Sequence, residues 1–125
     1  MREIHQAVTP IKRPLTRQEL GWINEILTAN PEWADVTISE LETEAQCTCG
    51  CRSLVLKLPE HPQNPKAIDR VGPIGVIDII TKEGEAISVL LHALHGSLSI
   101  LEVVGLGIDK VPEQWEEISH TLSRQ

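Results

Sequence analysis

The sequence predicts an α+β domain in which an antiparallel sheet of about five strands carries an N-terminal helix and a short C-terminal helix. Apolar residues make up 41% of the 125 residues, yet Phe and Tyr are absent. The core must therefore consist mainly of Ile, Leu and Val, which favours sheet. Turn dipeptides at Glu83-Gly84 and His95-Gly96 separate three apolar runs in the second half of the chain. This length and composition fit a single domain spanning residues 1–125.

The chain begins with an arm and continues into a helix. Residues 1–15 contain two prolines and are predicted to be irregular. Thr16 and Glu19 have the spacing of a capping box, which predicts a helix N-terminus at this point. Asn30-Pro31 predicts the end of the helix, because a residue before proline avoids the α region. The apolar residues that follow helical spacing are Leu20, Ile23, Ile26 and Leu27.

Two strands are predicted in the middle of the chain, over residues 36–46 and 53–58. A loop over residues 59–73, with four prolines, follows them. Alternate side chains of a strand share a face, and one face of the first strand carries Glu40, Glu42 and Glu44. We expect this face to be exposed, because buried carboxylates would each need a partner. The stripe is either a docking surface for a basic protein or an ordinary solvated strand face.

The second half predicts three antiparallel strands, over residues 74–81, 85–94 and 97–104. If both turns are two-residue loops, Asp78 lies opposite Val89, and Val89 lies opposite Glu102. This register places Asp78 and Glu102 on the apolar core face and His92 on the other face. Pro112 suits the first turn of a short C-terminal helix. The apolar face of that helix is expected to carry Trp115, Ile118 and Leu122.

The charge of the chain limits its partners. Eleven basic and eighteen acidic residues give a net charge of −7. Phosphate groups repel such a chain, so neither nucleic acid nor an anionic membrane is an expected partner. A basic protein would be attracted, and the same charge also serves plain solubility. The chain lacks an apolar run of roughly 18 residues and the apolar run of a signal peptide. Together with an odd number of cysteines, these features predict a cytoplasmic protein.

Three cysteines form the sharpest local motif, Cys47, Cys49 and Cys51. A tight turn at this point can direct several thiolates to one place. Structural zinc takes four ligands and usually uses cysteines two to four residues apart, so His61 or His5 would have to complete the set. The motif is therefore a candidate zinc site or reactive thiol site, or three small apolar side chains packed at a turn. No cofactor is expected, with zinc as the open alternative.

Polar residues within the apolar strands offer a further interpretation. His92 and His95 are three residues apart on a predicted hairpin, so their side chains cannot converge on a metal ion. Asp78 and Glu102 share a predicted face and resemble a carboxylate pair, or each meets solvent or a cation. With His92 they would bind or hydrolyse a small ligand. No group is recognisable that would orient a nucleophile–base pair, so an enzyme is not expected.

Several short motifs carry a resemblance to a known group of proteins. The motifs are Trp22-Ile23, Cys47-Thr-Cys-Gly-Cys51, Leu90-Leu91-His92, His95-Gly-x-Leu-Ser and Leu101-Glu-Val. Over residues 15–115 they resemble a group of small, uncharacterised bacterial proteins, some of them similar to immunity proteins of contact-dependent growth inhibition. The resemblance implies an immunity protein, which binds and neutralises a toxin without catalysis. The acidic balance of the chain makes a basic toxin, such as a nuclease domain, the expected partner. The partner-binding residues are then expected to be Glu40, Glu42, Glu44 and His92.

Overall fold

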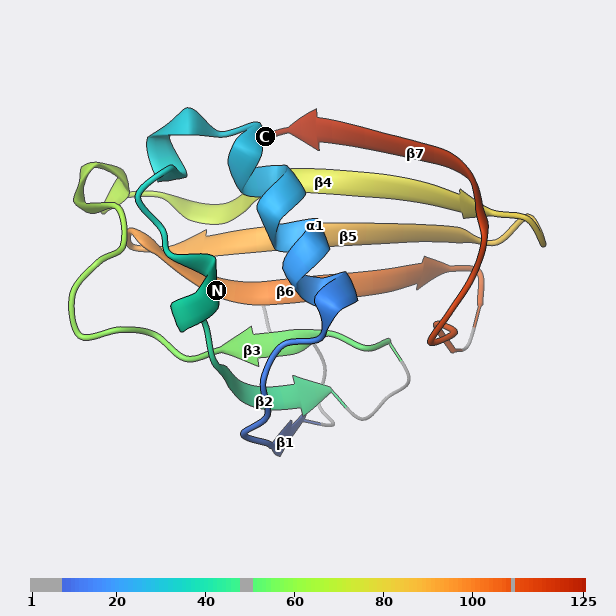
Figure 1. The fold of residues 1–125 in the computed structure, drawn as a ribbon, viewed down its shortest axis with the longest axis horizontal. Helices are drawn as coiled ribbons and strands as arrows, with labels where there is room; N and C mark the ends of the chain where they lie inside the picture. The colour runs from blue at the N-terminus through green and yellow to red at the C-terminus, as the bar shows by residue number, and fades with distance from the viewer. Residues whose placement is uncertain (1–7, 48–50, 109) are drawn as a thin grey trace.

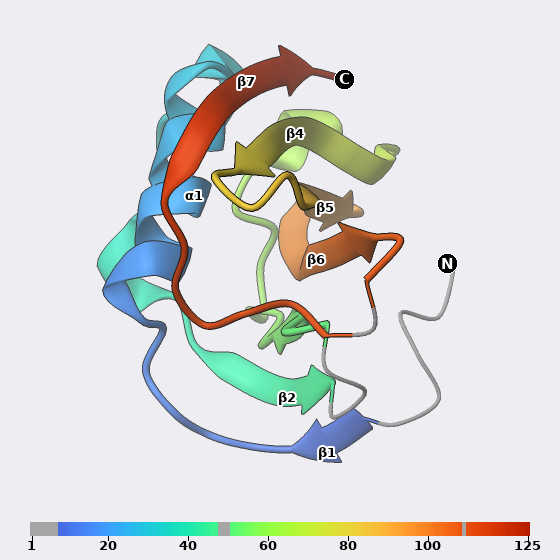
Figure 2. The same ribbon diagram turned by 90° about the vertical axis from the view of Figure 1, so that its right-hand side faces the viewer.

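One sheet with a helix across it forms the protein (Figure 1). The computed structural model describes residues 8–47, 51–108 and 110–125. The helices are α1 (Arg17–Thr28) and the short 3-10 helices η1 (Pro31–Trp33), η2 (Ile38–Glu40) and η3 (Pro65–Ala67). The strands are β1 (Val8–Pro10), β2 (Thr43–Cys47), β3 (Leu54–Leu56), β4 (Val71–Thr81), β5 (Ala86–Leu94), β6 (Ser97–Leu106) and β7 (Glu117–Arg124). Neighbouring strands are antiparallel in the order β1-β2-β3-β6-β5-β4-β7, and α1 covers one face (Figure 2).

The predicted architecture of about five strands and two helices is wrong. The part of the chain that the structure describes forms seven strands and one α-helix, although the fold is still a small α+β one. The additional strands lie at the two edges of the sheet. β1 occupies part of the predicted irregular arm and pairs with β2, while β7 replaces the predicted C-terminal helix and pairs with β4.

The C-terminal segment was mispredicted because its apolar spacing fits two structures. Ile118 and Leu122 are four residues apart, which suits one face of a helix and one face of a strand alike. The outer edge of β4 offers a row of backbone donors and acceptors that need partners. Strand pairing satisfies them from Gly75 to Thr81. A surface helix would have left this edge open.

Helix α1 begins and ends where the sequence predicts. The Thr16 hydroxyl accepts the Glu19 N–H at 3.1 Å, and the Glu19 carboxylate accepts the Thr16 N–H at 2.8 Å, which completes the capping box. The helix ends at Thr28, before Asn30-Pro31. Its buried apolar side chains are Trp22, Ile23, Ile26 and Leu27. Among the described residues, no helix is long and apolar enough to cross a membrane.

The β4–β5 hairpin differs from the predicted register by one residue. The Thr81 N–H donates to the Glu85 carbonyl at 2.9 Å, which leaves a loop of residues 82–84 instead of two residues. Asp78 consequently pairs with Ser88 rather than with Val89. A shift of one residue turns every side chain of a strand to the opposite face. Asp78 therefore leaves the predicted core face, and the buried positions of β4 include Ile77, Ile79 and Thr81.

The β5–β6 hairpin has the predicted turn but a different register beyond it. His95 and Gly96 have φ values of 49° and 86°, which a type I′ turn requires. A β-bulge next to His92 then shifts the pairing, so that Glu102 lies opposite Leu90 instead of Val89. The bulge carries Glu102 to the face that holds His92. We call this face, which points away from α1, the second face.

The predicted strand over residues 36–46 begins only at Thr43. The segment before it contains η2, whose last residue is Glu40. The expected alternation is confirmed around the start of β2, where Leu41, Thr43 and Ala45 are buried and Glu42 and Glu44 are exposed. This alternation directs the two glutamates away from the core.

Candidate functional site

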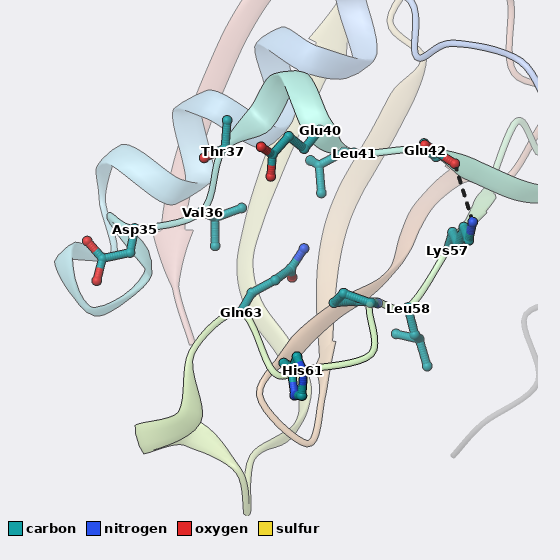
Figure 3. A pocket seen from close by; sticks show the side chains of 11 residues that line it. Asp35, Val36, Thr37, Glu40, Leu41, Glu42, Lys57, Leu58, His61 and Gln63 are labelled. Carbon is teal, nitrogen blue, oxygen red and sulfur yellow. Dashed lines mark ion pairs between the residues drawn. The ribbon is translucent and has the colours of Figure 1, made fainter.

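A cleft with mostly acidic charge lies between two segments of the chain, residues 35–42 and 57–63 (Figure 3). Its volume is about 410 Å³. Its lining residues are Asp35, Val36, Thr37, Glu40, Leu41, Glu42, Lys57, Leu58, Pro59, His61 and Gln63. We call it the acidic cleft. It contains two of the three glutamates that the sequence singled out.

The first wall of the acidic cleft is the segment that carries η2. The Glu40 N–H donates to the Thr37 carbonyl at 3.0 Å, and the Leu41 N–H donates to the Ile38 carbonyl at 3.1 Å. Leu41 is buried and fixes the wall to the core, whereas Glu40 and Glu42 on either side of it are exposed. A buried residue between two exposed ones therefore presents both carboxylates at the surface.

The second wall is the segment from Lys57 to Gln63, which lies opposite in Figure 3. The Lys57 N–H donates to the Glu42 carbonyl at 2.9 Å and joins the two walls at one end. The Gln63 side chain accepts the N–H of Leu98 at 2.7 Å, which attaches the wall to β6. Both ends of this proline-containing wall are thus held by hydrogen bonds to other segments.

The charges in the acidic cleft are only partly compensated. Glu42 and Lys57 form an ion pair at 3.7 Å, but both side chains are more than half exposed, so water screens it. No ion pair or hydrogen bond in the described part of the chain engages the carboxylates of Asp35 and Glu40. Leu58 adds an exposed apolar side chain. This combination suits a lysine or arginine side chain, whose apolar stem and charged end need different surroundings.

Glu44 is exposed as expected, but it belongs to β2 and does not line the acidic cleft. The predicted stripe of three glutamates is therefore divided between a 3-10 helix, a connecting residue and a strand. A ligand in the acidic cleft would contact Glu40 and Glu42. The binding role of all three residues stays a prediction.

His92 and Glu102 form a pair that the sequence prediction had placed on opposite faces. The His92 Nε2 and Glu102 Oε1 atoms are 2.9 Å apart, with side chains 21% and 6% exposed. The β-bulge brings them together on the second face. Glu102 thereby gains the partner that a buried carboxylate needs. The part of His92 in binding a partner stays a prediction.

Asp78 lies on the second face because the longer β4–β5 loop shifts the register of β4 by one residue. Its carboxylate accepts a hydrogen bond from the Ser88 hydroxyl at 2.6 Å. Asp78 and Glu102 thus have separate partners, Ser88 and His92, both on β5. Their use in hydrolysis, together with His92, stays untested.

The cysteine motif lies at the connection between β2 and β3. Cys47 is buried and Cys51 is half-buried, and the Cys51 thiol donates to the Ser53 hydroxyl at 3.2 Å. Cys49 lies outside the described residues. Within residues 8–47, 51–108 and 110–125, no group of three or more His, Cys, Asp or Glu is placed to hold a metal ion. The zinc site at Cys47, Cys49 and Cys51 therefore stays a prediction.

Sequence reasoning missed several residues of the acidic cleft. Asp35 and His61 come from irregular segments with no apolar period to indicate where their side chains point. Lys57 and Leu58 belong to the strand predicted over residues 53–58, but β3 ends at Leu56 and both residues lie in the loop that follows it. Their proximity depends on tertiary contacts between segments about twenty residues apart. The clustering of acidic residues before β2 was the one available signal.

Comparison with known proteins identifies no relative of this chain. No protein-family model matches the chain, and neither a curated protein nor a solved structure matches it.

Proposed function

We propose that the chain is an immunity protein, which binds a basic toxin domain and neutralises it without catalysis. The observation that carries the proposal is the acidic cleft, in which the carboxylates of Asp35 and Glu40 have no cation partner within the described chain. The short motifs that resemble immunity-associated proteins supply the biological role. The toxin is expected to be a nuclease, because enzymes that act on phosphate backbones carry basic surfaces.

Binding in the acidic cleft would combine charge with apolar contact. A lysine or arginine of the toxin would direct its cation to the carboxylates of the acidic cleft, while apolar lining residues would contact its stem. The net charge of −7 would attract the toxin over a longer range and speed its association. Neutralisation then follows from occupancy, because the basic surface that the toxin needs for its substrate is covered.

Co-expression with the product of the neighbouring gene tests the proposal. The unchanged chain should co-purify with that product and protect cells from it. The variant Glu40→Lys/Glu42→Lys should lose protection, because it replaces two carboxylates of the acidic cleft by cations. The control Asp69→Lys/Glu83→Lys changes the charge equally at exposed positions outside the cleft. Equal protection by both variants, or a neighbouring product that does not bind, would overturn the proposal.

A further inference from the structure

Arg52 occupies an unusual position next to the cysteine motif. It has a φ of 69°, a conformation that non-glycine residues seldom adopt. Its guanidinium carbon lies 5.9 Å from the ring centroid of Trp22 and 5.8 Å from that of Trp115. These two rings are stacked at 6.0 Å with an interplanar angle of 15°. Arg52 is thus held against α1 and against the segment that leads into β7.

The hydrogen bonds of Arg52 use only neutral acceptors. Nη1 donates to the Pro112 carbonyl at 2.8 Å and to the Glu113 carbonyl at 3.3 Å, and Nη2 donates to the Gln18 side chain at 2.7 Å. A guanidinium has five N–H groups, so Nε–H and one N–H of Nη2 remain without a partner in the described chain. No carboxylate of the described residues forms an ion pair with Arg52.

Arg52 lines a cavity of about 530 Å³. Arg13, Arg17 and Arg52 all line it. Arg13 is already bound to Glu19 through two hydrogen bonds of 2.9 Å. The Arg17 side chain is exposed and forms no ion pair or hydrogen bond with described residues, so two of the cations that line the cavity have no ion-paired carboxylate there. A second cavity of about 570 Å³ shares Arg52 and adds Lys110.

The electrostatics of the cavity lined by Arg17 and Arg52 also favour a bound anion. The pKa of Arg52 is lowered, because partial burial of the guanidinium outweighs the attraction of Glu19 and Glu113, and Arg13 repels it. Glu113 lines both cavities, but its side chain is exposed and makes no ion pair with Arg52. In a chain of net charge −7, this cluster of cations is an exception that a bound anion would explain.

We propose that the cavity between Arg17 and Arg52 binds an oxyanion group, carboxylate or phosphate, carried by a small soluble ligand. Arginine suits such groups, because its planar donors match two oxygens at once. The hydrogen bonds to Pro112, Glu113 and Gln18 hold the guanidinium of Arg52 in place and leave its remaining donors for the ligand. The acidic cleft takes no part in this site, so the proposal stands independently of the proposed function.

Titration of the purified chain with inorganic phosphate and with succinate tests the proposal, with sodium chloride at equal ionic strength as the reference. The side-chain Nε–H signals of Arg17 and Arg52 in an NMR spectrum report the binding. We expect saturable shifts of both signals with at least one of the two probes. Saturation by phosphate alone assigns a phosphate ester as the ligand, and saturation by succinate alone assigns a carboxylate.

Two single substitutions at the cavity should act in opposite directions. Arg17→Gln should weaken binding about tenfold, the range of one charge-assisted hydrogen bond. Glu113→Gln should tighten it about twofold, because it removes a competing negative charge. Arg124→Gln, on the distant strand β7, makes the same chemical change as Arg17→Gln and should leave binding unchanged. Shifts no larger than those with chloride, or equal effects of Arg17→Gln and Arg124→Gln, would overturn the site.

Discussion

Gly75 shows how a single residue sets the distance between helix and sheet. A Cβ atom at this position would lie 2.5 Å from Cγ2 of Ile26, a fully buried side chain of α1. Gly75→Ala should therefore destabilise the protein by about 1–3 kcal/mol, because overpacking displaces the helix. Gly21→Ala is the matched control, since nothing lies within 4 Å of its Cβ position and the residue is exposed in α1. It should stabilise by about 1 kcal/mol. Urea unfolding of both variants decides the question, and equal effects would contradict this packing.

His120 makes the attachment of β7 to α1 sensitive to pH. Its ring lies 2.8 Å from carboxylate oxygens of both Glu25 and Glu117. Burial lowers the pKa of His120, but the hydrogen bonds and charges of the two glutamates raise it above its usual value of 6.5. Protonation thus stabilises the folded chain. The contribution of His120 to the free energy of unfolding is complete below the unfolded-state pKa. It disappears as the pH rises through the folded-state pKa.

His120→Gln should therefore lower the free energy of unfolding by about 0.5–1 kcal/mol near pH 5.5. Near pH 9 the loss of these ion pairs should not change the free energy of unfolding. Unfolding free energies measured at both pH values provide the test. His61→Gln removes an exposed ring that makes no hydrogen bond with described residues, so it should show no such dependence. A cost for His120→Gln that does not change with pH would exclude the two ion pairs as its source.

Single residues also mark the limit of what the sequence could predict. The capping box of Thr16 and Glu19 is a local interaction, and the sequence predicted it correctly. The contact between His92 and Glu102 is different, because it depends on a β-bulge. No residue type in this segment predicts that bulge. The left-handed Arg52 was also missed, because its interactions come from segments distant in sequence.

At the scale of elements, the length of one turn decided which face of β4 is buried. Glu83-Gly84 indicated the correct hairpin, but the loop has three residues instead of two. Because strand side chains alternate with a period of two, this difference inverted the predicted faces of β4 while leaving those of β5 correct. The positions of the central strands were predictable from sequence, whereas their register was not.

The strand β7 can be distinguished from the helix that the sequence predicted. The Gln125 N–H donates to the Ile74 carbonyl at 3.2 Å, and the register continues through Thr121 opposite Asp78. Backbone amides in an antiparallel ladder alternate in direction. The amides of Ser119, Thr121 and Ser123 should therefore exchange with solvent deuterium more slowly than those of His120, Leu122 and Arg124. Amide exchange measured by NMR tests this, and uniform protection along the segment would indicate a helix.

At the scale of the whole molecule, charge is distributed unevenly. The acidic cleft concentrates Asp35, Glu40 and Glu42 between two loops, while the cavity at Arg17 and Arg52 concentrates cations. The sequence predicted an acidic docking surface from Glu40, Glu42 and Glu44, and the structure exposes all three. It could not predict the cleft, because the opposite wall comes from a proline-containing loop that carries no periodic signal.

The rate at which the chain associates with the neighbouring gene product tests the central claim most directly. Stopped-flow measurements over a series of salt concentrations should show a rate that falls steeply as salt rises, because opposite charges steer the encounter. Glu40→Lys/Glu42→Lys should keep the fold and lower the rate at low salt by about tenfold or more, with little salt dependence left. The variant Asp69→Lys/Glu83→Lys should retain most of the association rate at low salt and most of its salt dependence. Rates and salt dependences that are the same for the two double variants would contradict the assignment of the acidic cleft as the binding surface.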